Sequence, residues 1–330
     1  MQDLIDPIFQ SKQNLETAFI DGLESMLEND ELGVFILVLA NALFDDKLWK
    51  ILKPALAKKF EQLKSCPITG APDDVDVFNQ LTKLNFDELE VTQWREIGGF
   101  ELQYNPLRAL RPQRLSGAKT KGMSIAFDVK GFHFNKPFLQ KESFWEGQFF
   151  SKKVSLLYNK FPFAPLHGLV VVEREQQHPQ LLTFELHQFA WMMANSVSIG
   201  IPGFSLAYNS YGAYASVNHF HLQCFVREKP LPLENDKKYP LVHYWFEALS
   251  DAWEFIEALH RDEQPYHLIY QNNKILCVVR QRQDNYIHAD WTAGYAWYEA
   301  CGGVSTANID NFKNLDETEL KEELNKLIIK

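Results

Sequence analysis

The segment NHFHLQCFV, residues 218–226, places two histidines and a glutamine at alternating positions of an apolar run. In a β-strand, residues two apart project from the same face, so we expect His219, His221 and Gln223 to share one. The opposite, apolar side would then hold Phe220, Leu222 and Cys224. An isolated His-x-His pair is more often packed within a strand than part of a site. The glutamine and the small-residue loop before the strand favour a nucleophile and its support beside a phosphate.

These residue types suit transfer between phosphates. Imidazole has an unperturbed pKa of about 6.5, so near neutral pH a ring nitrogen is available as a nucleophile. Glutamine forms hydrogen bonds but cannot act as an acid. A phosphate monoester has a second pKa near 6, so it departs without protonation and attacks without a base. Gln223 at this position therefore favours phosphorolysis or transfer over hydrolysis.

The sequence YNSYGAYASVNHFHLQ (208–223) resembles the nucleotidyltransferase branch of the histidine-triad superfamily, in which a loop with Asn and Gly leads to Ser-Val-x-His-x-His-x-Gln. Within that branch it is most similar to the GDP-hexose phosphorylases and also resembles the diadenosine-tetraphosphate phosphorylases. Other segments agree in order: LQYNPLRALRPQR (102–114), FHFNKPFLQKE (132–142), YNKFPFAPLHGLVVVE (158–173) and HLIYQNNKILCVVRQRQ (267–283). The resemblance covers roughly residues 98–300.

The resemblance implies specific catalytic roles. His221 would attack the α-phosphorus of a nucleotide and form a covalent nucleotidyl-histidine intermediate, from which a second acceptor takes the nucleotidyl group. The backbone carbonyl of His219 would accept the proton on the other ring nitrogen of His221, and Gln223 would hold a phosphoryl oxygen. His219, His221 and Gln223 are therefore the candidate catalytic residues.

Substrate contacts are expected in the preceding loop and in two earlier segments. Negative charge on the α-phosphate requires hydrogen-bond donors, and the loop offers these from Asn209, Ser216 and Val217, with Gly212 allowing close approach. Asn159 and His167 would brace the site. The candidates for the distal or attacking phosphate are Arg108 and Lys136, together with Arg111 or Arg114.

The surrounding pattern predicts an α+β fold with a largely antiparallel sheet, and the resemblance implies a histidine-triad-like, galactose-1-phosphate uridylyltransferase-like sheet with packed helices. We expect an N-terminal helical extension at 1–65, a boundary region at 66–97 and a nucleotidyltransferase domain at 98–330. The predicted strands include 98–105, 123–135, 153–159 and 167–173. Helices are predicted at 180–198 and 239–259 and at the C-terminus, with a hairpin turning at 271–273.

Composition narrows the range of partners. The 330 residues carry a formal net charge of −10, which disfavours nucleic acid or an anionic membrane as a partner. Four scattered cysteines without a CxxC pair suit a reducing compartment. The N-terminus does not resemble a signal peptide, and the most apolar run, 32–44, is shorter than the roughly 20 residues a membrane span needs. We therefore expect a cytoplasmic protein.

The sequence thus predicts a nucleotidyltransferase that needs no metal or other cofactor. Its partners would be a nucleotide or nucleotide-sugar and inorganic phosphate. The leading reaction is phosphorolysis of a GDP-hexose to GDP and a hexose 1-phosphate. The first alternative is a diadenosine-tetraphosphate phosphorylase or ATP adenylyltransferase, and the second is a non-catalytic nucleotide-binding regulatory protein.

Overall fold

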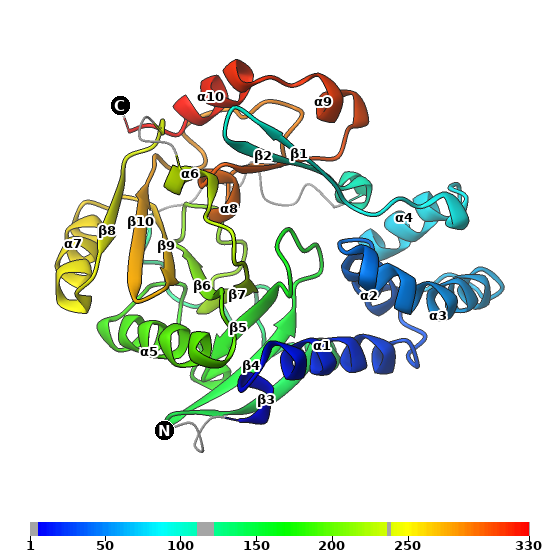
Figure 1. The fold of residues 1–330 in the computed structure, drawn as a ribbon. Helices are drawn as coiled ribbons and strands as arrows, with labels where there is room; N and C mark the ends of the chain where they lie inside the picture. Colours follow the sequence, from blue (N-terminus) through cyan, green and yellow to red (C-terminus); the bar gives the residue numbers. More distant parts are fainter. Residues whose placement is uncertain (1–5, 111–121, 236–238, 330) are drawn as a thin grey trace.

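An eight-stranded antiparallel sheet forms the centre of the molecule (Figure 1). The computed structural model describes residues 6–110, 122–235 and 239–329. Every neighbouring pair of strands in this sheet is antiparallel, which confirms the predicted α+β class. In spatial order the strands are β3 (Ser143–Phe149), β4 (Lys152–Tyr158), β5 (Gly168–Val172), β7 (His221–Val226), β6 (Phe204–Asn209), β9 (Tyr266–Gln271), β10 (Lys274–Val279) and β8 (His243–Phe246).

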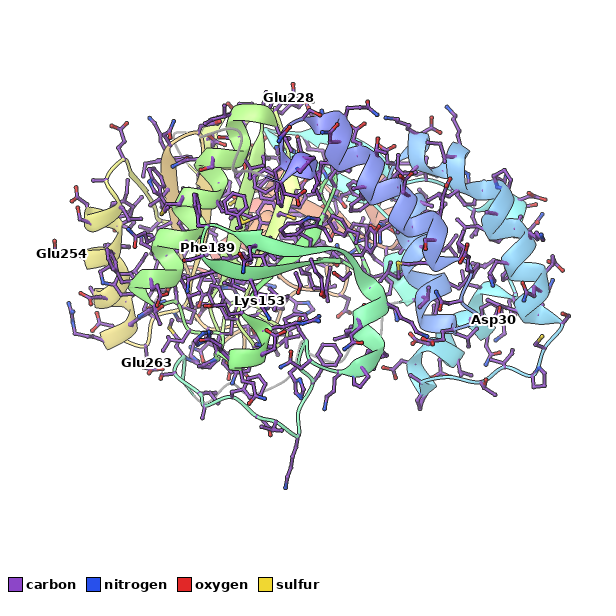
Figure 2. All side chains as sticks on the ribbon, turned by 90° about the horizontal axis from the view of Figure 1, so that it is seen from below. Asp30, Lys153, Phe189, Glu228, Glu254 and Glu263 are labelled. Atoms are coloured by element: carbon purple, nitrogen blue, oxygen red, sulfur yellow. The ribbon has the colours of Figure 1, made fainter. Side chains whose placement is uncertain are left out.

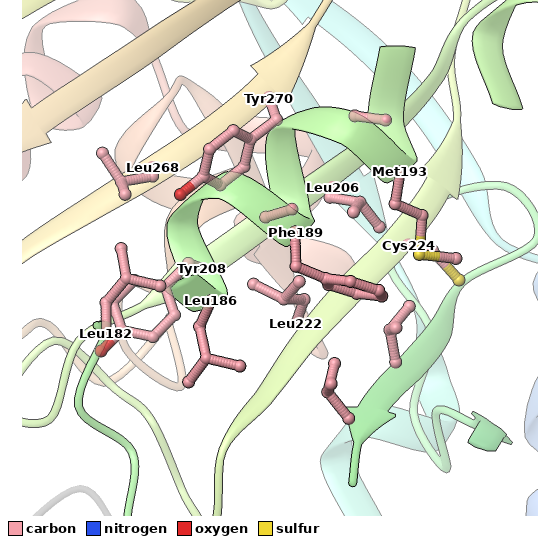
Figure 3. Close-up of a cluster of buried hydrophobic side chains, with 14 of the residues drawn as sticks. Leu182, Leu186, Phe189, Met193, Leu206, Tyr208, Leu222, Cys224, Leu268 and Tyr270 are labelled. Carbon is pink, nitrogen blue, oxygen red and sulfur yellow. The ribbon is translucent and has the colours of Figure 1, made fainter. Parts of the chain in front are cut away.

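One face of the sheet is covered by helices α5 (Phe184–Gly200) and α7 (Leu249–Arg261). The apolar stripe of α5 provides Leu186, Phe189 and Met193, which meet Leu222 and Cys224 of β7 (Figure 3). Phe220 lies in the same core. The predicted apolar side of the histidine strand is therefore confirmed, and it fixes which face of β7 remains for polar residues.

The other face of the sheet is covered in two parts. A smaller sheet of β1 (Gln93–Ile97), β2 (Phe100–Tyr104) and β11 (Gly303–Thr306) covers one end, together with α8 (Trp297–Ala300), α9 (Ile309–Asn314) and α10 (Glu317–Asn325). Residues 122–142, which we call the cover segment, lie over the other part. Phe134 and Leu139 of this segment pack on Leu157, Val171 and Val217.

Four N-terminal helices form a second core beside the end of β4 (Figures 1 and 2). They are α1 (Lys12–Met26), α2 (Leu32–Ala42), α3 (Asp46–Lys64) and α4 (Pro72–Leu81). Tyr158 of β4 donates its hydroxyl to the carbonyl of Phe19 at 2.7 Å, and Asn41 of α2 donates to the carbonyl of Asn159 at 3.0 Å. Figure 2 shows Asp30 at the far end of this helical group and Glu254 of α7 at the opposite end of the molecule. The stretch 66–97 carries α4 and β1.

The helix α2 matches the apolar run of the sequence, and all of its residues except Gly33 are buried in this second core. Within the ranges described, no helix combines the length and apolar character needed to cross a bilayer.

Two predicted elements differ from the structure. The segment 123–135 is not a strand, because side chains rather than a neighbouring strand hold its backbone: Asn218 donates to the carbonyls of Ile125 and Ala126. The segment 239–259 is not one helix. Its first half forms β8 along β10, as its aromatic and β-branched residues allow, and the helix begins only at Leu249. The predicted hairpin turn is confirmed, with Asn272 and Asn273 both at positive φ as a type I′ turn requires.

The end of α5 touches the N-terminal segment so closely that it accepts only glycine. A Cβ on Gly200 would lie 2.5 Å from the backbone oxygen of Gln10. We expect Gly200→Ala to lower the free energy of unfolding by about 1–3 kcal/mol, because the backbone must shift to relieve the clash. Urea denaturation measures this. The matched control is Ile199→Ala, next to it and 70% exposed, which should change stability by about 0.5 kcal/mol or less. A Gly200→Ala protein as stable as the parent would contradict the contact.

Candidate active site

The first residue of β7 is His221, and its ring orientation is fixed by one backbone contact. Its Nδ1 lies 2.8 Å from the carbonyl oxygen of His219. A carbonyl only accepts hydrogen bonds, so the proton sits on Nδ1 and the lone pair is on Nε2. None of the described residues hydrogen-bonds to Nε2, and the side chain is 5% exposed. The His219 carbonyl is the group that the resemblance assigns to this role.

Burial keeps the His221 ring neutral. It lowers the pKa of His221 to about 4, and the bond to the His219 carbonyl opposes this shift only in part. The pKa of His219 is likewise lowered to about 4, first by burial and then by the neighbouring His221. Near neutral pH both imidazoles are uncharged, which leaves the Nε2 lone pair of His221 available.

The side chain of His219 supports the cover segment. Regular strand begins at His221, and residues 217–219 form a bend before β7, but the rings of His219 and His221 both contact Phe134, so they lie on the same side as predicted. The His219 ring packs against Phe127 and Phe134, and its Nδ1 accepts the backbone N–H of Phe134 at 3.1 Å. Phe134 in turn places its ring 5.1 Å from that of His221.

The buried side chain of Gln180 fixes the backbone around His221. Its Oε1 accepts the backbone N–H of His221 at 2.9 Å. Its Nε2 donates to the carbonyls of His221, at 3.1 Å, and of Asn209, at 3.0 Å. Gln180 therefore joins the ends of β6 and β7 where His221 begins its strand.

Gln223, the second polar residue on this face of β7, is held by two donors. Its Oε1 lies 2.7 Å from the indole Nε1 of Trp297 and 2.9 Å from Nε2 of His167. The indole nitrogen only donates, so the amide oxygen faces these two residues and the NH₂ group faces away from them. Flipping the amide would leave two donors without acceptors, at a cost of about 1–3 kcal/mol each.

The tautomer of His167 follows from its own contacts. Its Nδ1 accepts the backbone N–H of Phe163 at 3.3 Å, so Nε2 carries the proton that Gln223 accepts. Burial is the main cause that lowers the pKa of His167, to about 3. Nδ2 of Asn159 lies 3.2 Å from the same Nε2, but both groups are donors in this tautomer, so this contact is not a hydrogen bond; Oδ1 of Asn159 accepts the N–H of Phe161. His167 and Asn159 thus lie against the side of Gln223 that faces the protein interior.

The loop before β7 has the features expected of an anion-binding turn. Gly212 has a φ of 92°, and its carbonyl accepts the N–H of Gln283. Ser216 is exposed, while Val217 is buried against the cover segment. Among the residues described, the backbone N–H groups of 215–219 have no hydrogen-bond partner. The loop can therefore offer several donors to an anion beside His221.

Asn209 is buried at the end of β6, where its amide oxygen accepts two hydrogen bonds. Its side chain is 2% exposed, and its Oδ1 accepts both Nδ1–H of His267, at 2.7 Å, and the backbone N–H of Trp297, at 3.0 Å. The oxygen of this amide is thus used inside the protein, where it ties β6 to β9 and to α8.

The basic candidates are separated. Arg108 is 8% exposed, with Nη2 3.5 Å from Glu299 and its guanidinium 5.4 Å above the Phe163 ring. Burial lowers its pKa, and its Nη1 is buried without a hydrogen-bond partner in the described parts of the chain. Lys136 lies in the cover segment, half-buried, two residues beyond Phe134. Arg111 and Arg114 lie outside the described residues.

No group of three or more His, Cys, Asp or Glu side chains in the ranges described is placed to hold a metal ion.

Comparison with known proteins finds similarity over the part of the chain that carries this site. Residues 88–225 match the family described as "GDPGP1-like, N-terminal domain". The matched range includes Arg108, His167, His221 and Gln223, and it ends before Trp297.

Two curated relatives share part of the sequence. "GDP-D-glucose phosphorylase 1" of Danio rerio is 31% identical over 159 residues, which cover 47% of this chain and 44% of that protein. The Homo sapiens protein of the same name is 34% identical over 151 residues, which cover 43% of this chain and 38% of that protein. The matched region therefore spans less than half the length of these distant relatives.

The fold is similar to that of the yeast Ap4A phosphorylase Apa2. Its crystal structure matches with a TM-score of 0.52 and 16% identity, over 72% of this chain and 86% of that one. The same protein in complex with Ap4A matches with a TM-score of 0.50 and 17% identity, over 77% and 95%. This likeness confirms the expected galactose-1-phosphate uridylyltransferase and histidine-triad type of fold.

Gln180 and Trp297 are the site residues absent from the sequence prediction. Gln180 stands in HPQLLT, which carries no recognisable motif, and Trp297 lies in a stretch outside the quoted family segments. The only available signal for Trp297 was its chemistry, because a buried indole needs an acceptor for its N–H.

Because several buried histidines have lowered pKa values, we expect the free energy of unfolding to fall in acid. Besides His167, His219 and His221, His187 of α5 has its pKa lowered to about 4, mainly by burial. Between pH 4 and 6.5 the unfolded chain binds protons that the folded protein does not, so stability rises with pH in this window. From pH 7.5 to 5, each such histidine should lower the free energy of unfolding by on the order of 2 kcal/mol.

Urea denaturation at the two pH values measures this loss. The variant His187→Leu removes one buried histidine, which is hydrogen-bonded to Tyr270 on the helical face of the sheet. It should reduce the loss in free energy of unfolding between pH 7.5 and 5 by on the order of 2 kcal/mol. Equal free energies of unfolding at pH 7.5 and 5 would show that these pKa values are not lowered.

Proposed function

We propose that this protein is a nucleotide phosphorylase that works through a nucleotidyl group carried on Nε2 of His221. The observation that carries the proposal is the 2.8 Å contact between Nδ1 of His221 and the carbonyl of His219, which places the proton on one nitrogen and the lone pair on the other. The neutral state that burial imposes on His221 also supports it.

The chemistry proceeds in two steps. The lone pair of Nε2 forms a bond to the α-phosphorus, and the bond from that phosphorus to the bridging oxygen breaks, so the distal phosphate leaves with its electron pair. Nδ1 keeps its proton and shares it with the His219 carbonyl. Inorganic phosphate then attacks the same phosphorus, the P–N bond breaks, and its electrons return to His221. No proton has to be moved in either step, because both leaving groups and acceptors are phosphates or a neutral imidazole.

The surrounding groups supply donors for the charge on the α-phosphate. The NH₂ group of Gln223 faces away from its two supports, and the loop at 215–219 offers backbone N–H groups and the hydroxyl of Ser216. Donors of this kind stabilise the oxygens that gain charge in the transition state. Asn209 has a positioning role in this scheme through Trp297.

For the substrate, we propose a GDP-hexose, converted with phosphate to GDP and a hexose 1-phosphate. The match of residues 88–225 to the GDPGP1-like family and the names of the curated relatives support this choice. Arg108 and Lys136 are proposed to meet the distal or attacking phosphate; the unpartnered Nη1 of Arg108 supports its part. A dinucleoside polyphosphate is the second candidate, since the fold neighbour was crystallised with Ap4A.

Replacing the nucleophile tests the mechanism. We expect His221→Asn to abolish turnover and labelling by an α-phosphorus-labelled nucleotide, with nucleotide affinity changed by about tenfold or less, because the ring contributes to chemistry and little to binding. The matched control is His243→Asn, on the far edge strand β8, which should keep full activity. A His221→Asn protein that still turns over would show that another residue carries the nucleotidyl group.

A substrate panel separates the candidates. The purified protein is incubated with phosphate and GDP-glucose, GDP-mannose, GDP-galactose or Ap4A, and the products are resolved by chromatography. We expect GDP and a hexose 1-phosphate from at least one GDP-hexose. ADP and ATP from Ap4A alone would favour the second candidate, and tight nucleotide binding without turnover of any compound would favour the regulatory protein.

A further inference from the structure

Trp297 makes contacts that tie it directly to Gln223. Its indole Nε1 donates to Oε1 of Gln223 at 2.7 Å, and its backbone N–H donates to Oδ1 of Asn209 at 3.0 Å. The ring is fully buried and stacks on Phe225, with centroids 4.3 Å apart and planes 20° from parallel. Both polar groups of Trp297 and its apolar ring are thus fixed, and the direction of the indole N–H cannot vary.

The direction of each hydrogen bond around Gln223 is determined by groups that can only donate. Besides the indole of Trp297, the backbone N–H of Phe163 donates to Nδ1 of His167, which forces the proton of that ring onto Nε2. Nε2–H then donates to the same oxygen of Gln223. Two donors therefore converge on Oε1 of Gln223, and only the carboxamide oxygen can occupy that position.

We propose that Trp297 is a positioning residue that, together with His167, sets the polarity of the Gln223 amide so that its NH₂ group faces the phosphoryl group on His221. This inference rests on the proposed function. With the opposite polarity, the carbonyl oxygen of Gln223 would face the phosphoryl oxygens and repel their charge. Gln223 is half-buried on the strand face that it shares with His221, and its Nε2 has no hydrogen-bond partner among the described residues.

A purely structural role for Trp297 makes a different prediction. If the ring only fills space beside Phe225 and Phe163, its removal should disturb the site equally whether or not Gln223 is present. If the indole acts through the amide, its removal should matter only while the amide is there. A double-mutant cycle distinguishes the two, because residues that act through one another are not additive.

The cycle compares Trp297→Phe in the parent and in a Gln223→Ala background. The measured quantity is the single-turnover rate at which His221 is labelled by α-phosphorus-labelled GDP-glucose, or by labelled Ap4A if only that compound is turned over. We expect Trp297→Phe to lower this rate roughly 10- to 100-fold in the parent, and by less than about twofold in the Gln223→Ala background. The control is Trp94→Phe, at a 46% exposed position on β1, which should leave the rate unchanged. Equal losses in both backgrounds, or no loss in the parent, would overturn the proposal.

A second variant separates the two ends of the amide. Gln223→Glu keeps an oxygen for the indole N–H but replaces the NH₂ donor with a second acceptor. We expect it to label His221 at least about 100-fold more slowly than the parent, because the donor is lost. The Trp297 indole proton should keep its downfield NMR position in Gln223→Glu and lose it in Gln223→Ala. A Gln223→Glu protein with parental activity would overturn the assigned polarity.

Failure of the proposed function can be distinguished from failure of the assigned polarity of the Gln223 amide. If the parent is labelled by no nucleotide of the panel, the proposed function fails, and a titration with GDP followed by NMR decides the polarity. Movement of the Gln223 amide protons in the parent, and its loss in Trp297→Phe, would support the inference. Amide protons that respond identically in both proteins would overturn it.

Discussion

A single hydrogen bond, from Nδ1 of His221 to the backbone carbonyl of His219, determines which ring nitrogen of His221 keeps a free lone pair. The carbonyl of His219 holds the proton of His221 on Nδ1, and this carbonyl belongs to the bend at 217–219 that precedes the strand. Gln180 holds the bend in place by accepting the N–H of His221 and donating to carbonyls on β6 and β7. The apolar side of β7, sealed by α5, prevents the strand from turning over and burying the other face. The His221 ring is thus oriented by the backbone first and by side chains second.

Polar groups are buried around Gln223, and a chain of hydrogen bonds pairs those that face its amide oxygen. Trp297 and His167 satisfy the amide oxygen, Phe163 satisfies His167, and Asn209 satisfies the backbone of Trp297. Low dielectric strengthens these bonds and makes any unpaired member costly, so the network has one stable arrangement. The same burial keeps His167 and His221 uncharged, which preserves the direction of each bond near neutral pH.

Local patterns in the sequence predict the elements whose conformation is set by residues close together along the chain. The alternation in 218–226 gave the strand and its apolar side, and the Asn272–Asn273 pair gave the hairpin, because both are set within a few residues. The contacts of Gln180 with His221 and of Trp297 with Gln223 join residues 41 and 74 positions apart, and no local pattern encodes them. The sequence predicts a strand at 123–135 because apolar and polar residues alternate there. In the structure this alternation follows the burial of the side chains, and the segment does not pair with a neighbouring strand.

The contact between Asn41 and the carbonyl of Asn159 limits how far the helical group can be separated from the sheet. Asn41 is 1% exposed and lies in the most apolar helix, where a polar side chain is costly without a partner. Separating the helical group from the sheet would break this hydrogen bond and open the Asn159 carbonyl to water, while Asn41 would keep its bond to the carbonyl of Leu37. The helical group and the β4–β5 connection therefore depend on each other for the pairing of these two polar groups.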